Sequence, residues 1–98
     1  ADPRLGLYAA VTRQDLEGQP PGGWLPDQKL TPMEALQGFT TDAAWAAFRE
    51  GEVGRLEPGL HADFVLLDAD PITSPPARLP GIRVLSTWLD GVAVYTAP

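Results

Sequence analysis

The sequence contains no cysteine and only one histidine among its 98 residues. Without cysteine there is no disulfide framework, no thiolate metal site and no thiol nucleophile. Basic residues are also few, because 7 Lys and Arg stand against 13 Asp and Glu, and the formal net charge is −6. Since a nucleic-acid backbone is bound by clustered cations, we expect no nucleic-acid partner.

Long apolar runs are missing as well. No stretch approaches the roughly 20 residues that a membrane-spanning helix needs, so we expect no membrane partner. What is present is a globular composition, 44% hydrophobic and 20% charged, interrupted by 11 Pro and 10 Gly. A chain of this length can form one small domain with a thin core. It begins at Ala1 rather than Met, and we expect a piece of a longer protein.

The first half predicts helices separated by a long loop. Apolar residues at helical spacing predict a short helix over Leu5–Gln14. Residues 16–29 hold three Pro and three Gly without a hydrophobic period, which predicts a loop. We expect Trp24 to pin this loop to the body by burial; alternatively, the loop borders a ligand site or a subunit contact.

Two short helices should follow this loop. Thr31 and Glu34 form a capping-box pattern around Pro32, which predicts a helix that Gly38 ends. A second helix should start at Thr40-Thr41-Asp42 and end at Gly51. Its apolar stripe would consist of three residues, Ala44, Trp45 and Phe48.

The second half predicts strands. The run Phe64–Leu67 is typical of a strand buried on both faces. Pro58-Gly59 predicts a type II turn, and Pro71–Pro80 should be irregular. Asp90-Gly91 predicts a hairpin over Val84–Tyr95. The expected cross-strand pairs are Leu89 with Val92, Trp88 with Ala93, Thr87 with Val94, and Ser86 with Tyr95.

The single histidine, His61, is the first candidate for chemistry. A metal site there would need ligands from Asp63, Asp68 or Asp70, and one histidine with acids from one strand is too few for a closed zinc site. We interpret His61 as a solvated turn residue. A weaker alternative is a small metal-binding protein that uses His61 with Asp63 and Asp70.

Other patterns are weaker still. Asp68-Ala69-Asp70 resembles part of a calcium loop, but the closing ligands are absent, and solvation of a strand end explains it better. Ser74 and Ser86 lack the Gly-x-Ser-x-Gly setting of a nucleophile. The glycines form no phosphate-binding loop, and Glu50 with Glu52 belongs to a charged helix end. No self-sufficient active site is predicted.

The order of the motifs is more informative than any one of them. The stretch from Gly54 to Asp68 has the pattern G-x-L-x-x-G-x-x-A-D-x-x-x-L-D, and a D-G-x-x-V-Y hairpin closes the chain. Two further motifs lie upstream: A-A-V-T-R, which ends at Arg13, and L-T-P-M-E-A-L, which begins at Leu30. From Pro3 to Tyr95 the chain resembles the C-terminal segment of a metal-dependent amidohydrolase, in the branch of the N-substituted formamide deformylases.

This resemblance implies a fold for the chain and a location for the metal ligands of the parent enzyme. The chain would be an α+β fragment, with residues 1–52 supplying helices from the end of a (β/α)8 barrel and residues 53–98 supplying strands of a composite β-sandwich. The family's metal ligands would lie upstream of Ala1. This chain would therefore hold no cofactor and be inactive alone, while the parent enzyme would use a divalent metal, zinc being expected, to hydrolyse amide-type carbon–nitrogen bonds.

The remaining expectations concern single residues, partners and a competing function. Arg13 is the one substrate-binding candidate, and the alternative is that it ties its helix to a neighbouring loop. Asp63 should stabilise the turn at Pro58-Gly59. The main partner should be the upstream part of the same polypeptide, and exposed strands could form a homodimer. The competing function is a stand-alone interaction module that binds a partner through its sheet edge or its Trp24 loop.

Overall fold

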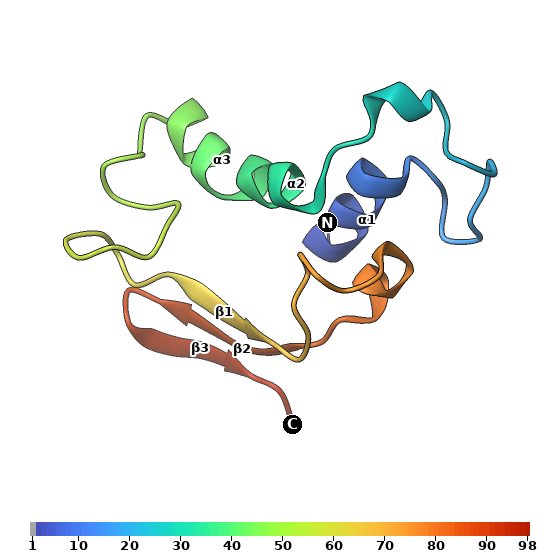
Figure 1. Ribbon diagram of the computed structural model, residues 1–98. Helices are drawn as coiled ribbons and strands as arrows, with labels where there is room; N and C mark the ends of the chain where they lie inside the picture. Colours follow the sequence, from blue (N-terminus) through green and yellow to red (C-terminus); the bar gives the residue numbers. More distant parts are fainter. Residues whose placement is uncertain (1) are drawn as a thin grey trace. The chain divides into compact units, whose positions relative to one another are not determined.

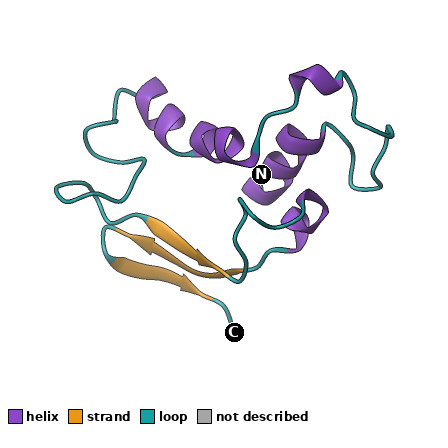
Figure 2. Cartoon of the chain, viewed as in Figure 1, coloured by secondary structure: helices purple, strands orange, loops and turns teal. Residues whose placement is uncertain are grey.

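The computed structural model describes residues 2–98 and shows an α+β fold, with helices first and strands after them (Figures 1 and 2). The α-helices are α1 (Pro3–Thr12), α2 (Pro32–Phe39) and α3 (Thr41–Ala46), and two 3-10 helices are η1 (Pro26–Gln28) and η2 (Pro76–Gly81). The strands are β1 (Phe64–Leu67), β2 (Val84–Leu89) and β3 (Val92–Thr96). Within the described residues, no helix has the length and apolar character to cross a bilayer.

The described residues divide into two compact units. The first unit runs up to Leu36 and includes Asp70–Ile82, so it holds α1, η1, η2 and the start of α2. The second unit consists of Gln37–Ala69 and Arg83–Pro98, and it holds the end of α2, α3 and the three strands.

The first unit has a small hydrophobic core, in which α1 and η2 pack together, and Ala35 of α2 is also buried. Five apolar residues are buried there: Tyr8, Val11, Ala35, Leu79 and Ile82. A polar contact joins α1 to the end of η2, because Arg4 Nη1 donates to the Ile82 carbonyl at 2.7 Å. The Tyr8 hydroxyl donates to the Asp15 carbonyl in the loop after α1 at 2.8 Å. Helices α1 and η2, far apart in sequence, are thus held together by both packing and a hydrogen bond.

Helix α1 is shifted by two residues from the expected Leu5–Gln14. It starts at Pro3 because the Asp2 carboxylate caps it, accepting the Arg4 N–H at 3.0 Å. It ends at Thr12 because Arg13 adopts a left-handed conformation, with φ of 53°.

Helix α2 begins as predicted and ends one residue later. Thr31 Oγ1 accepts the Glu34 N–H at 3.2 Å, and Glu34 Oε1 accepts the Thr31 N–H at 2.9 Å, which confirms the capping box. Gly38 does not end this helix, because it keeps a helical conformation and α2 continues to Phe39.

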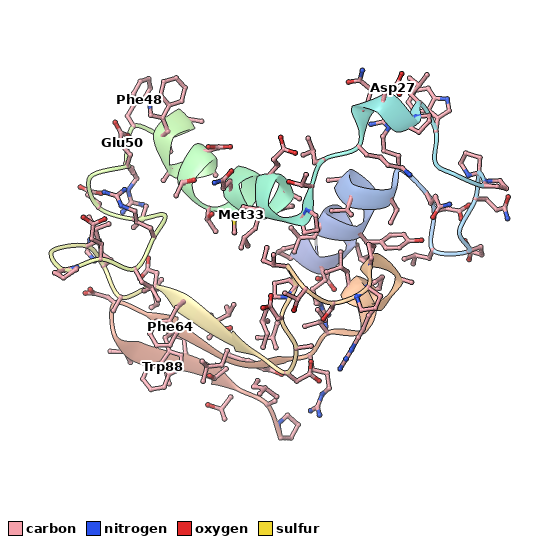
Figure 3. All side chains as sticks on the ribbon, in the orientation of Figure 1. Asp27, Met33, Phe48, Glu50, Phe64 and Trp88 are labelled. Atoms are coloured by element: carbon pink, nitrogen blue, oxygen red, sulfur yellow. The ribbon has the colours of Figure 1, made fainter. Side chains whose placement is uncertain are left out.

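Helix α3 is shorter than the sequence predicts, and its apolar stripe is not buried. It ends at Ala46 rather than near Gly51, and Phe48 takes a left-handed φ of 59° just beyond it. Only Ala44 is buried, whereas Trp45 is 71% exposed and Phe48 is 92% exposed. Figure 3 shows the Phe48 ring at the end of the helical segment.

The sheet is antiparallel in the order β1-β2-β3, and the predicted hairpin on Asp90-Gly91 is confirmed. Its register is right at the turn and wrong beyond it. Leu89 pairs with Val92 and Trp88 with Ala93, but Val94 is then bypassed by a bulge. The next pairs are therefore Thr87 with Tyr95 and Ser86 with Thr96.

Two further expectations need correction. Strand β1 is not buried on both faces, because among residues 2–98 it is an edge strand paired with β2 alone, and Val65 and Leu66 are exposed. The segment Pro71–Pro80 is not wholly irregular, since η2 starts at Pro76, where the ring fixes a helical φ. The type II turn is confirmed by the Leu60 N–H to Glu57 carbonyl bond and the positive φ of Gly59.

Candidate functional site

Arg13 binds the loop that follows α1. The Arg13 backbone N–H donates to the Ala9 carbonyl, and the side-chain Nε donates to the Trp24 carbonyl. In return the Trp24 N–H donates to the Arg13 carbonyl at 2.9 Å. The guanidinium carbon lies 5.0 Å from the centre of the Trp24 ring, a cation–π geometry.

The loop is therefore fixed at its base, although Trp24 is not buried. The indole is 63% exposed, so the expected pinning by burial is wrong, and pinning through Arg13 takes its place. Gly23 is part of this contact, because a Cβ built there would lie 2.4 Å from the Thr12 carbonyl oxygen. Only glycine allows the loop to approach the end of α1 so closely.

The position of Arg13 bears on its candidacy as a substrate-binding residue. It lies at the C-terminal cap of α1, so a helix of 10 residues, about 15 Å long, separates it from the start of α1. Its guanidinium is occupied by Trp24. The alternative role, tying the helix to a loop, describes these contacts; substrate binding by Arg13 stays a prediction.

His61 is paired rather than simply solvated. Its Nδ1 lies 2.9 Å from Asp90 Oδ1, and the two side chains are 45% and 73% exposed. The hydrogen bond and charge of Asp90 raise the pKa of His61 above its usual 6.5, with smaller contributions from Asp63 and Glu52. The sequence shows both residues but not their pairing, because they are 29 positions apart.

The aspartates near His61 cap backbone groups. Asp63 Oδ1 accepts the Asp90 N–H at 2.7 Å, so Asp63 stabilises the β2–β3 turn and not the Pro58-Gly59 turn that we expected. Asp68 accepts the Arg83 N–H at 2.9 Å, and Asp70 accepts the Ile72 N–H at 2.7 Å. These contacts are the strand-end and turn roles that acids commonly take.

The described residues do not fit a metal centre. Within residues 2–98, no group of three or more His, Asp or Glu side chains lies close enough together to hold an ion. The proposed set of His61, Asp63 and Asp70 is therefore not assembled. Ser86 is not placed for catalysis either, because it is buried and its hydroxyl accepts the Trp88 indole N–H at 3.0 Å.

The most distinctive surface of the second unit is its sheet. The sequences of β1, β2 and β3 contain no charged residue, and most of their large apolar side chains are exposed. The register aligns Val65, Thr87 and Tyr95 in one row across the three strands and pairs Leu89 with Val92. Because side chains alternate between the two faces of a sheet, five exposed apolar residues share the face of this row, whereas Leu66 lies on the opposite face. We call these five the apolar sheet surface: Val65, Leu85, Leu89, Val92 and Tyr95. Soluble proteins seldom leave such a patch uncovered.

One aromatic pair stabilises the sheet itself. Phe64 and Trp88 are cross-strand partners whose ring centres are 5.5 Å apart and whose planes differ by 8°. Figure 3 shows the two rings beside one another on neighbouring strands. This stack holds β1 to β2 without closing a core, and the Trp88–Ser86 hydrogen bond within β2 orients the indole.

Comparison with known proteins identifies the class. The chain matches the Amidohydrolase family over residues 1–95, and it belongs to that family.

Among curated relatives, it is 36% identical over 89 residues to the N-substituted formamide deformylase of Arthrobacter pascens, covering 91% of this chain and 16% of that protein. It is 42% identical over 69 residues to the imidazolonepropionase of Streptomyces griseus, covering 69% of this chain and 17% of that protein. The crystal structure of an amidohydrolase from Thermotoga maritima aligns with a TM-score of 0.55 and 26% identity, over 65% of this chain and 15% of that one. The chain thus spans about a sixth of the length of each.

Proposed function

We propose that this chain is a C-terminal structural part of a metal-dependent amidohydrolase that hydrolyses amide-type carbon–nitrogen bonds. The family match and the small share of each relative that it covers support this assignment. In such enzymes a divalent metal supplies the activation of water and the polarisation of the carbonyl. Because the described residues do not fit a metal, its ligands would come from the rest of the polypeptide, with zinc the expected ion.

The single observation that carries the proposal is the apolar sheet surface. It lies on a unit whose only buried apolar residue is Ala44, so this unit has surface to cover and little core of its own. Strands from the upstream polypeptide would cover it and complete a sandwich. In that arrangement residues 53–98 would join the sandwich and residues 1–52 would pack on the barrel.

A first test measures the mass of the native gene product. An antibody raised against this chain should detect, in the cells that make it, a band several times larger than 10.5 kDa. A band at 10.5 kDa would contradict the proposal. The purified chain should show no chelator-sensitive amide hydrolysis, and such activity would also contradict it.

A second test places charge on the surface within the longer protein. Leu89→Lys should destabilise that protein strongly, because a lysine would be buried in the sandwich without a partner. The matched control is Leu56→Lys, at a similarly exposed leucine outside the strands. Equal melting temperatures for the two variants would show that the sheet surface is not covered there.

Arg13 can be tested in the same protein. A substrate contact predicts that Arg13→Ala raises KM at unchanged stability. If Arg13 instead only ties its helix to the Trp24 loop, Arg13→Ala should lower the melting temperature and leave KM unchanged. Trp24→Ala would then have the same effect.

A second candidate function rests on the uncharged edge strands. Charged residues normally protect edge strands from pairing, and β1 and β3 have none. The chain alone could therefore act as an interaction module and form a homodimer through these strands. Light scattering of the purified chain should then show a mass that rises with concentration; a monomer at all concentrations would exclude the homodimer.

A further inference from the structure

A short segment before β1 is joined to the β2–β3 turn by three separate contacts. His61 Nδ1 lies 2.9 Å from Asp90 Oδ1. Asp63 Oδ1 accepts the Asp90 N–H at 2.7 Å, and the Ala62 carbonyl accepts the Gly91 N–H at 2.9 Å. Residues 61–63 thus act as a clasp on the turn, and every one of these atoms belongs to the second unit.

One of the three contacts contains an imidazole, the side chain whose ordinary pKa lies near neutral pH. The bond from Gly91 to Ala62 joins two backbone groups, which do not titrate. The strength of the clasp should therefore depend on the protonation of His61.

We propose that His61 and Asp90 form a proton-controlled clasp, which holds the β2–β3 turn firmly when His61 is protonated and loosens it when His61 is neutral. The inference rests on these contacts and is independent of the proposed function. It concerns the turn that connects two strands of the apolar sheet surface, and so it links pH to the order of that surface.

The charges around His61 support the direction. The carboxylates that face it are Asp90 from the turn, Asp63 from its own segment, and Glu52, whose carbonyl accepts the His61 N–H at 2.8 Å. All are acidic, so they favour the imidazolium and raise its pKa. A group with a raised pKa stabilises the folded form below its unfolded value, about 6.5, and this contribution is lost as the pH rises through the folded value.

The neutral imidazole can keep a hydrogen bond to Asp90 if the proton is on Nδ1, but it loses the charge attraction. We therefore expect loosening and not opening of the turn. Because the pair is exposed, the change in local protection should be a few-fold at most.

The experiment is an NMR titration of the 98-residue chain. As the only histidine, His61 gives a single set of imidazole signals, and the midpoint of their titration should lie above 6.5. Asp90→Asn should lower the midpoint and keep the turn, because asparagine also adopts the left-handed conformation found at Asp90. The matched control is Asp42→Asn, in the same unit but not among the carboxylates that face His61, and it should leave the midpoint unchanged.

Amide exchange measures the turn directly. The Gly91 amide, bonded to Ala62, reports the clasp, while the Ala97 amide, bonded to the Leu85 carbonyl at 2.8 Å, reports the other end of the hairpin. The ratio of the Gly91 to the Ala97 protection factor should fall as the pH rises from 5.5 to 8. This fall should be absent in Asp90→Asn.

Three outcomes would overturn the proposal. They are a midpoint at or below 6.5, a midpoint unchanged by Asp90→Asn, and a protection ratio that does not vary with pH. An unprotected Ala97 amide would mean that the hairpin is not formed in the chain, and this too would count against the clasp.

Discussion

The two units of this chain bury apolar surface very differently. The first unit has five buried apolar residues, whereas the second has only Ala44. The second unit nevertheless carries 11 of the 17 large apolar side chains that are exposed in the described residues, against 6 in the first. One unit therefore has a core of its own, and the other consists of hydrogen-bonded elements whose apolar side chains are mostly exposed. Secondary structure can form without a core where turns, caps and strand pairing agree.

The largest expected effect comes from truncating one leucine in each unit. Leu79→Ala should cost about 2 to 5 kcal/mol, because it leaves a cavity in the first core. Leu89→Ala should change the stability of this chain by less than about 0.5 kcal/mol, since its side chain is exposed. A urea titration that follows NMR signals of each unit measures both changes in stability. Equal changes would contradict the view that the first unit has a core and the second does not.

Two matched glycine pairs give the next largest effect. Gly23→Ala and Gly54→Ala should each cost about 1 to 3 kcal/mol, because the new Cβ would lie 2.4 Å from Thr12 and 2.7 Å from Ala44, respectively. Gly22→Ala and Gly59→Ala share the positive φ but meet nothing within 4 Å. They should cost only the backbone strain, so thermal unfolding that finds each pair equal would show that the close approaches are not tight.

The capping box of α2 should contribute about 1 kcal/mol, which Thr31→Ala would remove. The bonds from Thr31 lower the pKa of Glu34 below its usual 4.5. The contribution of the ionised Glu34 to the capping box is therefore present above 4.5 and is lost as the pH falls through the lower folded value. Helicity measured by circular dichroism from pH 6 to 2 should decrease in that window, and Glu34→Gln should remove this acid-dependent step.

The smallest effect is the coupling between Arg13 and Trp24. A double-mutant cycle with Arg13→Ala and Trp24→Ala should give about 0.5 to 1 kcal/mol, the range for an exposed cation–π pair. Arg13→Lys should keep part of it. Additive costs would show that the guanidinium and the indole do not act together.

Local features were predictable from sequence, and long-range ones were not. The capping box, the Pro58-Gly59 turn and the Asp90-Gly91 hairpin depend on residues a few positions apart, and the structure confirms each. The bulge at Val94 shifted the hairpin register, because the turn fixes only the pairs next to it. Burial was predicted least well.

Trp45 and Phe48 illustrate why. Their spacing indicates an apolar helix face that is suited to burial. The spacing does not show whether other residues of this chain pack against that face, and Trp45 and Phe48 are in fact exposed. The same reasoning applies to β1. At the candidate site, the sequence drew attention to Arg13, His61 and Asp63, but their partners Trp24 and Asp90 could be assigned only from the structure.

The Arg13–Trp24 contact has a consequence for how this sequence can vary in length. Two backbone bonds, Trp24 to Arg13 and Leu30 to Ala10, close the loop at its base, so the geometry of the flanking helices does not depend on the loop's tip. Doubling a loop of this kind costs only about 0.6 kcal/mol in closure entropy. Extra residues between Pro21 and Gly22 should therefore be accommodated outside the base, and this position is suited to carrying an inserted tag or label.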